Sequence, residues 1–87
     1  MGSYSLFIKP SAGKELEAIR QKKVQQRIIS GIRALADDPR PIGCEKLSGS
    51  VALYRVRVGV YRIVYAIDDE LAEVHVSKIG HRREVYR

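Results

Sequence analysis

The stretch that decides the fold runs from Leu53 to Ile67 and reads LYRVRVGVYRIVYAI. Large apolar residues recur at every second position on each side of Gly59, and the glycine itself marks a tight turn. Because side chains alternate between the two faces of a sheet, the apolar residues of both strands share one face. The stretch therefore predicts an antiparallel hairpin whose opposite face carries Arg55, Arg57 and Arg62.

The register of this hairpin depends on which two residues form its loop. If the loop is Gly59-Val60, with glycine in the first position as a type II′ turn prefers, Arg57 lies directly opposite Arg62. A loop that begins one residue earlier places Arg55 opposite Arg62 instead. Both registers keep the three arginines together, whereas a three-residue loop would move Arg62 to the core side.

A third strand is predicted for AEVHVSKI, residues 72–79, after an acidic turn at residues 68–70. The same alternation assigns Ala72, Val74 and Val76 to the core face. His75 and Ser77 then join the arginine face, and Ile79 ends the strand beside it. We expect the backbone to turn at Gly80, so that residues 81–86 fold over the arginine face.

The N-terminal half predicts one strand and two helices. Tyr4 to Lys9 reads as a strand that Pro10 ends, and Ser11 is the expected N-cap of the first helix. An apolar stripe at helical spacing then runs through Leu16, Ile19, Val24, Ile28, Ile32 and Leu35. A break in the stripe near residues 21–23 suggests a helical hairpin, and the prolines of DDPRPIG end its second helix.

These elements predict a single α+β domain over residues 1–87, with the order β-α-α-β-β-β. A small antiparallel sheet is expected to pack against the N-terminal helical hairpin. No apolar run reaches the ~20 residues that span a bilayer, and no signal peptide is evident, so we expect a cytoplasmic protein without a membrane partner.

Composition restricts the chemistry. The single cysteine, Cys44, excludes an intramolecular disulfide and a cysteine-based zinc site, and no metal-ligand cluster is evident, so no cofactor is expected. Lys and Arg number 16 against 10 Asp and Glu, for a net charge of +6. Like charges directly opposite each other destabilise a sheet. With only Glu73 as a nearby acid, the arginine face therefore predicts a site for an anion such as a nucleic-acid backbone.

Two segments resemble the RelE branch of the RelE/ParE toxin superfamily: LSGSVALYRVRVGVYRIVYAI at residues 47–67 and VSKIGHRREVY at residues 76–86. The Leu-x-Gly, the Tyr-basic-x-basic strand, the Tyr-Arg-x-Val-Tyr strand and the Gly-His-Arg-x-x-Val-Tyr ending follow the family order. The resemblance implies a toxin that enters the ribosomal A site and cuts mRNA there. The resemblance also implies a RelB-like antitoxin that silences the toxin. The toxin would contact operator DNA only indirectly, through this antitoxin.

The resemblance also implies roles for particular residues. Arg55 and Arg57 match the basic residues of the family's second strand, and Arg62 matches the arginine of the next one. His81 or Arg82 matches the basic residue after the final glycine, and Tyr86 matches the C-terminal tyrosine. Well-known members carry lysine at the positions of Arg55 and Arg57. Because arginine effectively does not lose its proton, these two are phosphate clamps and not a general base.

Cleavage of RNA without a metal needs groups that move protons and cations that stabilise the dianionic transition state. Histidine has an ordinary pKa near neutrality, so His81 is the best candidate for proton transfer, with Arg82 as the alternative. Arg62 and Arg82 would stabilise charge. Arg83 adds phosphate binding, and Tyr86 is better suited to stacking on a base than to proton transfer.

Two other functions remain open from the sequence. A toxin of the ParE branch would inhibit DNA gyrase by binding it, although that branch usually lacks the full set of basic residues and tyrosine found here. A catalytically weak homologue would bind RNA or operator DNA without cleaving it, with an affinity that falls steeply as salt rises.

Overall fold

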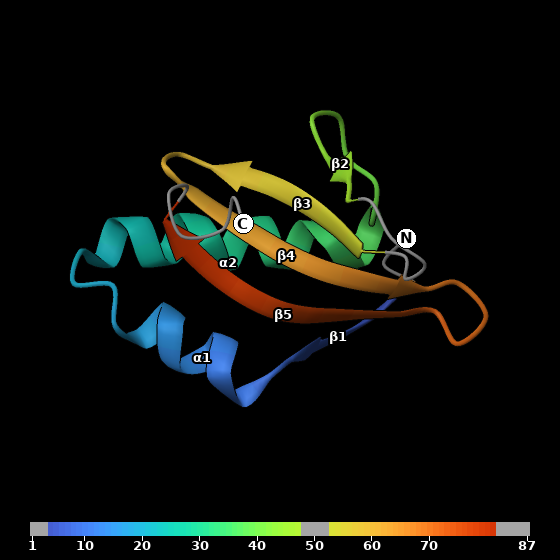
Figure 1. Ribbon diagram of the computed structural model, residues 1–87, viewed down its shortest axis with the longest axis horizontal. Coiled ribbons are helices and arrows are strands. Elements are labelled where there is room, and N and C mark those ends of the chain that lie inside the picture. The colour runs from blue at the N-terminus through green and yellow to red at the C-terminus, as the bar shows by residue number, and fades with distance from the viewer. Residues whose placement is uncertain (1–3, 48–52, 82–87) are drawn as a thin grey trace.

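The computed structural model describes residues 4–47 and 53–81 (Figure 1). Its elements are β1 (Ser5–Ile8), α1 (Pro10–Glu17), α2 (Lys22–Asp37), β2 (Glu45–Lys46), β3 (Leu53–Val58), β4 (Tyr61–Asp68) and β5 (Glu73–His81). The strands form one sheet in the order β1-β5-β4-β3-β2, and α2 passes behind it in Figure 1. The α+β class and the three strands of the C-terminal half are confirmed.

The β3–β4 hairpin has the register expected for a Gly59-Val60 loop. Arg57 is the direct partner of Arg62. Gly59 has a φ of 61°, and among the described non-glycine residues only Ala72 has a positive φ. A positive φ at the first loop position alone fits a type II′ turn and not a type I′ turn. The predicted arginine face is therefore formed.

The sheet is mixed and not wholly antiparallel as predicted, because β1 runs parallel to β5. Ser5 pairs with Glu73 and Ile8 with Val76. Alternation along a strand indicates which side chains share a face, but it does not indicate the partner strand or its direction. The chain between β1 and β5, which includes both helices, is a crossover long enough for parallel pairing. The two-residue β2, which is too short to show any alternation, pairs with β3 at the other edge.

Helix α1 begins at Pro10 and not after a Ser11 cap. Proline needs no hydrogen bond at the first helical position, and its fixed φ suits a helix start. The helix lies beside β5 where β1 has ended (Figure 1). There the Glu15 carboxylate accepts hydrogen bonds from the backbone N–H of Ile79 at 2.9 Å and from Lys78 Nζ at 2.6 Å. A side chain thus satisfies an edge N–H of the sheet that β1 does not reach.

Helix α2 covers one face of the sheet and supplies the helical half of the core. Its predicted apolar stripe buries Ile28, Ile32 and Leu35. The sheet contributes Ile63, Tyr65, Ile67, Val74, Val76 and Ile79 to the same cluster. Helix and sheet approach closely at Gly31, where an added Cβ would lie 3.1 Å from Val58 Cγ2.

A β-bulge in β5 overturns the expected geometry of the chain after Ser77. The partner of Val64 is Lys78 and that of Tyr65 is Val76, so Ser77 is an extra residue. Its hydroxyl donates to the Val64 carbonyl at 3.3 Å. The extra residue reverses the parity of the strand. Ile79 therefore lies in the core, 2% exposed, and not beside the arginine face.

The predicted turn at Gly80 is wrong, because the pairing of β5 with β4 continues past this residue. Gly80 pairs with Arg62 inside β5, and the strand continues through His81, which pairs with Tyr61. Because Tyr61 packs against the core, its partner His81 emerges on the side of the sheet that α2 covers. The predicted folding of residues 82–86 over the arginine face lies outside the described residues.

Candidate functional site

The arginine face consists of Arg55, Arg57 and Arg62 on the side of β3 and β4 that is turned away from α2. Arg57 is exposed and makes no ion pair or side-chain hydrogen bond with another described residue. Arg62 is 3% exposed, and the Arg55 side chain is 12% exposed. The guanidinium of arginine stays charged at any physiological pH. Two cations of this face, Arg55 and Arg62, are therefore largely buried, and the third, Arg57, is exposed to the solvent.

Glu45 of β2 belongs to this face, and the sequence analysis missed it. It pairs in register with Arg55, and its carboxylate forms an ion pair with the Arg55 guanidinium. The Arg55 hydrogen bond and charge lower the pKa of Glu45, and the fields of Arg57 and Arg62 add to this effect. Glu45 is thus an ionised carboxylate among the arginines. The expected acid, Glu73, instead contacts His75 Nε2 at 2.8 Å.

His81 lies on the opposite side of the sheet from the arginines. Its ring meets that of Tyr61 edge to face, with centroids 5.9 Å apart. Both rings line an open hollow of about 810 Å³ between the α1–α2 turn and the ends of β4 and β5. Tyr61, the cross-strand partner of His81, directly precedes Arg62 in β4. His81 and the arginine face are therefore neighbours on opposite sides of the sheet.

The structure therefore brings together three of the seven predicted site residues and places a fourth, His81, next to them on the other side. The remaining three, Arg82, Arg83 and Tyr86, lie outside the described residues. In the described parts of the chain, no group of three or more His, Cys, Asp or Glu residues is arranged to hold a metal ion. None of the helices described there is long and apolar enough to cross a membrane.

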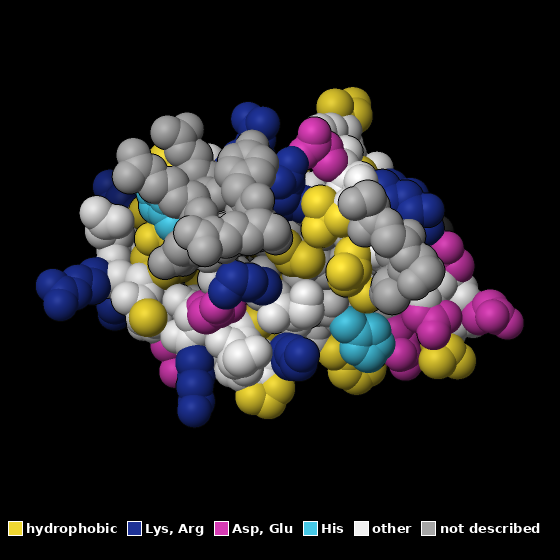
Figure 2. All heavy atoms as spheres, viewed as in Figure 1, with side chains coloured by type: hydrophobic (Ala, Val, Ile, Leu, Met, Phe, Trp, Pro, Cys, Tyr) yellow, Lys and Arg dark blue, Asp and Glu magenta, His cyan; other side chains and the backbone are white. Residues whose placement is uncertain are grey.

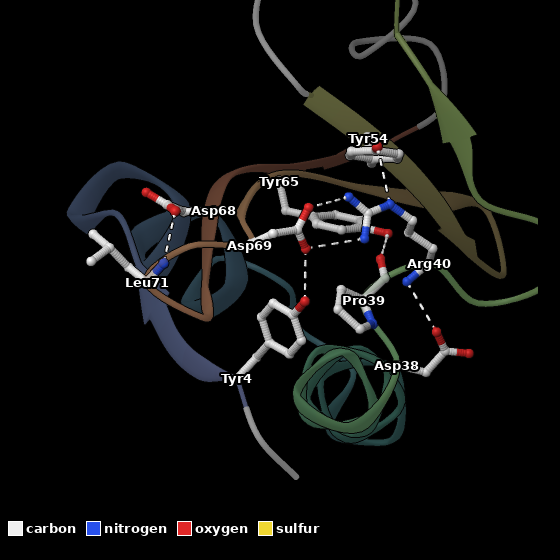
Figure 3. Close-up of polar contacts among 9 residues, drawn as sticks. All are labelled: Tyr4, Asp38, Pro39, Arg40, Tyr54, Tyr65, Asp68, Asp69 and Leu71. Atoms are coloured by element: carbon white, nitrogen blue, oxygen red, sulfur yellow. Dashed lines mark hydrogen bonds and ion pairs between the residues drawn. The ribbon is translucent and has the colours of Figure 1, made fainter.

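A polar cluster around a single arginine, Arg40, at the other end of β4, was not predicted (Figure 3). The Arg40 guanidinium donates to both carboxylate oxygens of Asp69, at 2.8 and 3.3 Å, and to the Tyr54 hydroxyl at 3.2 Å. Tyr4 donates to Asp69 at 2.7 Å. Arg40 and then Tyr4 hold the pKa of Asp69 below its usual value. The contacts tie the N-terminal segment to the β4–β5 turn and to the segment after α2, which is a structural role.

Tyr65 extends this structural cluster into the core. Its hydroxyl donates to the Pro39 carbonyl at 2.7 Å, and its ring stacks on Tyr54 at 5.9 Å between centroids. Burial raises the pKa of Tyr65. Figure 2 shows acidic side chains gathered around the adjacent β4–β5 turn, where the chain carries Asp68, Asp69 and Glu70. Cations at this end of the sheet have nearby carboxylates.

Two curated proteins of Mycobacterium tuberculosis are similar to this chain over 84 residues. Toxin RelE is 29% identical, with 97% of this chain and 87% of that protein aligned. Toxin RelG is 24% identical, with 97% of both aligned.

Solved toxin structures share the fold. The archaeal RelE–RelB complex of Pyrococcus horikoshii matches with a TM-score of 0.83 and 26% identity, over 92% of this chain and 96% of that one. The intact RelBE toxin-antitoxin complex of E. coli matches with a TM-score of 0.77 and 26% identity, over 90% and 95%. The family described as the ParE toxin of the type II toxin-antitoxin system parDE matches residues 6–86. The chain therefore belongs to the ParE toxin family and is a type II toxin of the RelE/ParE superfamily.

Proposed function

We propose that this toxin is a ribosome-dependent endoribonuclease that cuts mRNA in the ribosomal A site and is neutralised by a RelB-like antitoxin. The observation that carries the proposal is the direct cross-strand pairing of Arg57 with Arg62, beside Arg55. Like charges in that position destabilise a sheet, so their convergence fits a face that binds phosphates. The similarity to toxin RelE over 97% of the chain supports the choice of mRNA as substrate.

The proposed reaction needs no metal ion. The 2′-oxygen of one nucleotide attacks the adjacent phosphorus, the bond from phosphorus to the 5′-oxygen breaks, and a 2′,3′-cyclic phosphate forms. A base takes the 2′ proton, and an acid gives a proton to the departing 5′-oxygen. Arg62 and Arg82 stabilise the charge that develops on the phosphate oxygens. Arg55, Arg57 and Arg83 hold neighbouring phosphates.

His81 is the proposed proton donor, with Arg82 as the alternative, and Tyr86 stacks on a base. Because Arg62 and His81 lie on opposite sides of the sheet, the RNA has to pass around the end of β4 and β5 to meet both. Such a sparse set of groups needs a substrate that is held in an attack-ready geometry. Orientation of this kind supplies roughly 7–11 kcal/mol in favourable cases, and we propose that the ribosome provides it.

The test is to add the purified toxin to ribosomes that are translating a defined mRNA and to map the ends of the fragments. We expect cuts only in ribosome-bound mRNA, a 2′,3′-cyclic phosphate on the upstream fragment and a 5′-hydroxyl on the downstream one. Arg57→Gln should slow the cutting. Fragments with a 3′-hydroxyl, or equal cutting of naked mRNA, would contradict the proposal.

Inhibition of DNA gyrase is the second candidate, because the matching family is described as the ParE toxin. A supercoiling assay with purified gyrase separates the two functions. Inhibition of gyrase without mRNA cleavage would favour this candidate. Retained supercoiling together with mRNA cleavage would favour the endoribonuclease.

A further inference from the structure

We infer that the hollow between the α1–α2 turn and the ends of β4 and β5 binds one unstacked nucleobase of an RNA strand. The inference rests on the proposed function in taking RNA as the ligand. It adds a binding site on the helix side of the sheet, apart from the arginine face. The residues that carry it are Tyr61, His81, Glu15, Arg20 and Gln21, all of which line the hollow.

Two aromatic rings form one corner of the hollow. The planes of Tyr61 and His81 meet at 73°, and both residues are partly exposed. A flat nucleobase can stack on one ring while its edge approaches the other. Unstacked RNA bases are commonly held on tyrosine and histidine in this way. The volume of about 810 Å³ is within the range of small-molecule sites and leaves room for a base with its sugar.

A fixed carboxylate lies in the same hollow. Burial raises the pKa of Glu15, but the hydrogen bonds from Lys78 and from the Ile79 N–H outweigh it and hold the pKa below the usual value. Glu15 is thus an ionised, acceptor-only group whose orientation is set by two donors. A carboxylate oxygen can accept more than one hydrogen bond. It suits the exocyclic amino group of adenine, cytosine or guanine, which uracil lacks.

The rim adds donors. Arg20 and Gln21 belong to the turn between the helices and are exposed. Arg20 makes no ion pair with another residue in the described parts of the chain, so its guanidinium is available to a phosphate or to a base edge. An aromatic corner, a fixed acceptor and a charged donor together match the chemistry of a nucleotide.

The β-bulge at Ser77 places His81 in this hollow and not on the arginine face. Without the extra residue, His81 would point to the same side as Arg62. With the extra residue in place, an RNA strand whose phosphate contacts Arg57 and Arg62 reaches the hollow when the RNA passes around the end of the sheet. Bulges often re-aim side chains next to active sites.

The probe is a short 2′-O-methyl RNA, which cannot be cleaved, with 2-aminopurine at one position. We expect the full chain to quench the fluorescence of the probe at one position, because the base stacks on Tyr61. Tyr61→Leu should abolish the quench and weaken binding roughly 5- to 100-fold. Tyr61→Phe, which keeps the ring, should restore both. Phe7→Leu is the matched control, because Phe7 is an exposed aromatic residue on β1 that stacks on His75.

Base preference tests the carboxylate. Glu15→Gln keeps an acceptor for the Ile79 N–H but adds a donor, so discrimination against uracil at the quenched position should fall. A quench that survives in a folded Tyr61→Leu variant overturns the inference, and so does no quench with saturating wild-type protein. Weakened antitoxin binding in the Tyr61 and Glu15 variants with unchanged RNA binding would reassign the hollow to the antitoxin. Because no cleavage is measured, failure of the endoribonuclease proposal is seen separately, in the mRNA assay.

Discussion

The two ends of β4 use arginine in opposite ways. At the β4–β5 end, Arg40 has the Asp69 carboxylate, the Tyr54 hydroxyl and the face of the Tyr54 ring, 5.2 Å from its guanidinium carbon. At the β3–β4 end, the cross-strand neighbour of Arg57 is Arg62, a second cation.

The difference separates a structural arginine from the pair that we propose binds phosphate. Arg40 is placed where its charge is neutralised and its donors are used, so it stabilises the fold. Arg57 and Arg62 remain together although a sheet favours opposite charges in directly opposed positions. Glu45 neutralises Arg55 but lies on the far side of β3 from Arg62. Among the described residues, the β3–β4 end therefore places the exposed Arg57 beside a second cation, an arrangement that a sheet does not favour.

The largest expected effect is on cleavage at the Arg62 end. Arg62→Gln should lower the rate of mRNA cleavage on ribosomes about 10²- to 10³-fold, the usual loss for one donor to a transition-state oxyanion. Arg62→Lys keeps the positive charge but lacks the planar guanidinium group, so its cleavage rate should lie between those of the wild type and Arg62→Gln. Arg40→Gln is the matched control and should cleave at the wild-type rate at temperatures where it is folded. Equal rates for Arg62→Gln and wild type would remove the distinction between the two ends.

The next effect is on stability at the Arg40 end. Arg40→Gln should lower the free energy of unfolding, and its contact with the Tyr54 ring alone accounts for about 0.5–1 kcal/mol. Urea denaturation at neutral pH measures the loss. An unchanged midpoint would show that the contacts of Arg40 do not stabilise the fold.

The pH dependence of stability has a defined sign at this end. The pKa of Asp69 is lower in the folded protein than the ordinary value of an aspartate carboxyl. Its contribution to stability is therefore present above the ordinary value and is lost as the pH falls through the lower, folded value. Asp69→Asn should flatten the loss of stability below about pH 4. The stability of this variant should still decrease somewhat as the pH falls, because Glu15 and Glu45 also have lowered pKa values. Denaturation between pH 2 and pH 7 tests this.

A smaller effect of opposite sign is expected at Arg57. Arg57→Thr removes the like-charge pair and introduces a residue that favours strands, so the protein should gain about 0.2–1 kcal/mol while cleavage falls. The part of the gain due to repulsion should shrink in 1 M salt, where the screening length is about 3 Å. A destabilised variant would mean that the pair is not repulsive in its surroundings.

The smallest effect is expected at Glu45. Glu45→Gln removes the carboxylate that competes with RNA for Arg55, so affinity for single-stranded RNA should rise a few-fold. The slope of log K against log salt should steepen by about 0.7, as for one additional phosphate contact. Glu73→Gln, at the far end of β5, is the matched control and should have little effect on either quantity.

Local patterns were sufficient for much of this fold because each pattern carries its own physical cause. The period of two in Leu53–Ile67 placed the three arginines on one face, and Gly59 set the loop and hence the register. The period near 3.6 in residues 24–35 located the buried side of α2. Three other features could not be predicted: the pairing of β1, the contact of Glu45 with Arg55 and the Arg40–Asp69 pair. They join residues that are far apart in sequence, or they involve a strand that is too short to show a period. No local pattern indicates them.

The sequence by itself determined an α+β chain with a basic sheet face and a residue pattern typical of RelE-like toxins. These features follow from side-chain alternation and from the charge and shape of arginine, which do not depend on distant neighbours. Tertiary structure alone decided the position of His81. One extra residue at Ser77 reverses which side of β5 each later side chain occupies, and only the ladder with β4 reveals that residue. The ladder therefore separates the histidine from the arginines and places it beside Tyr61.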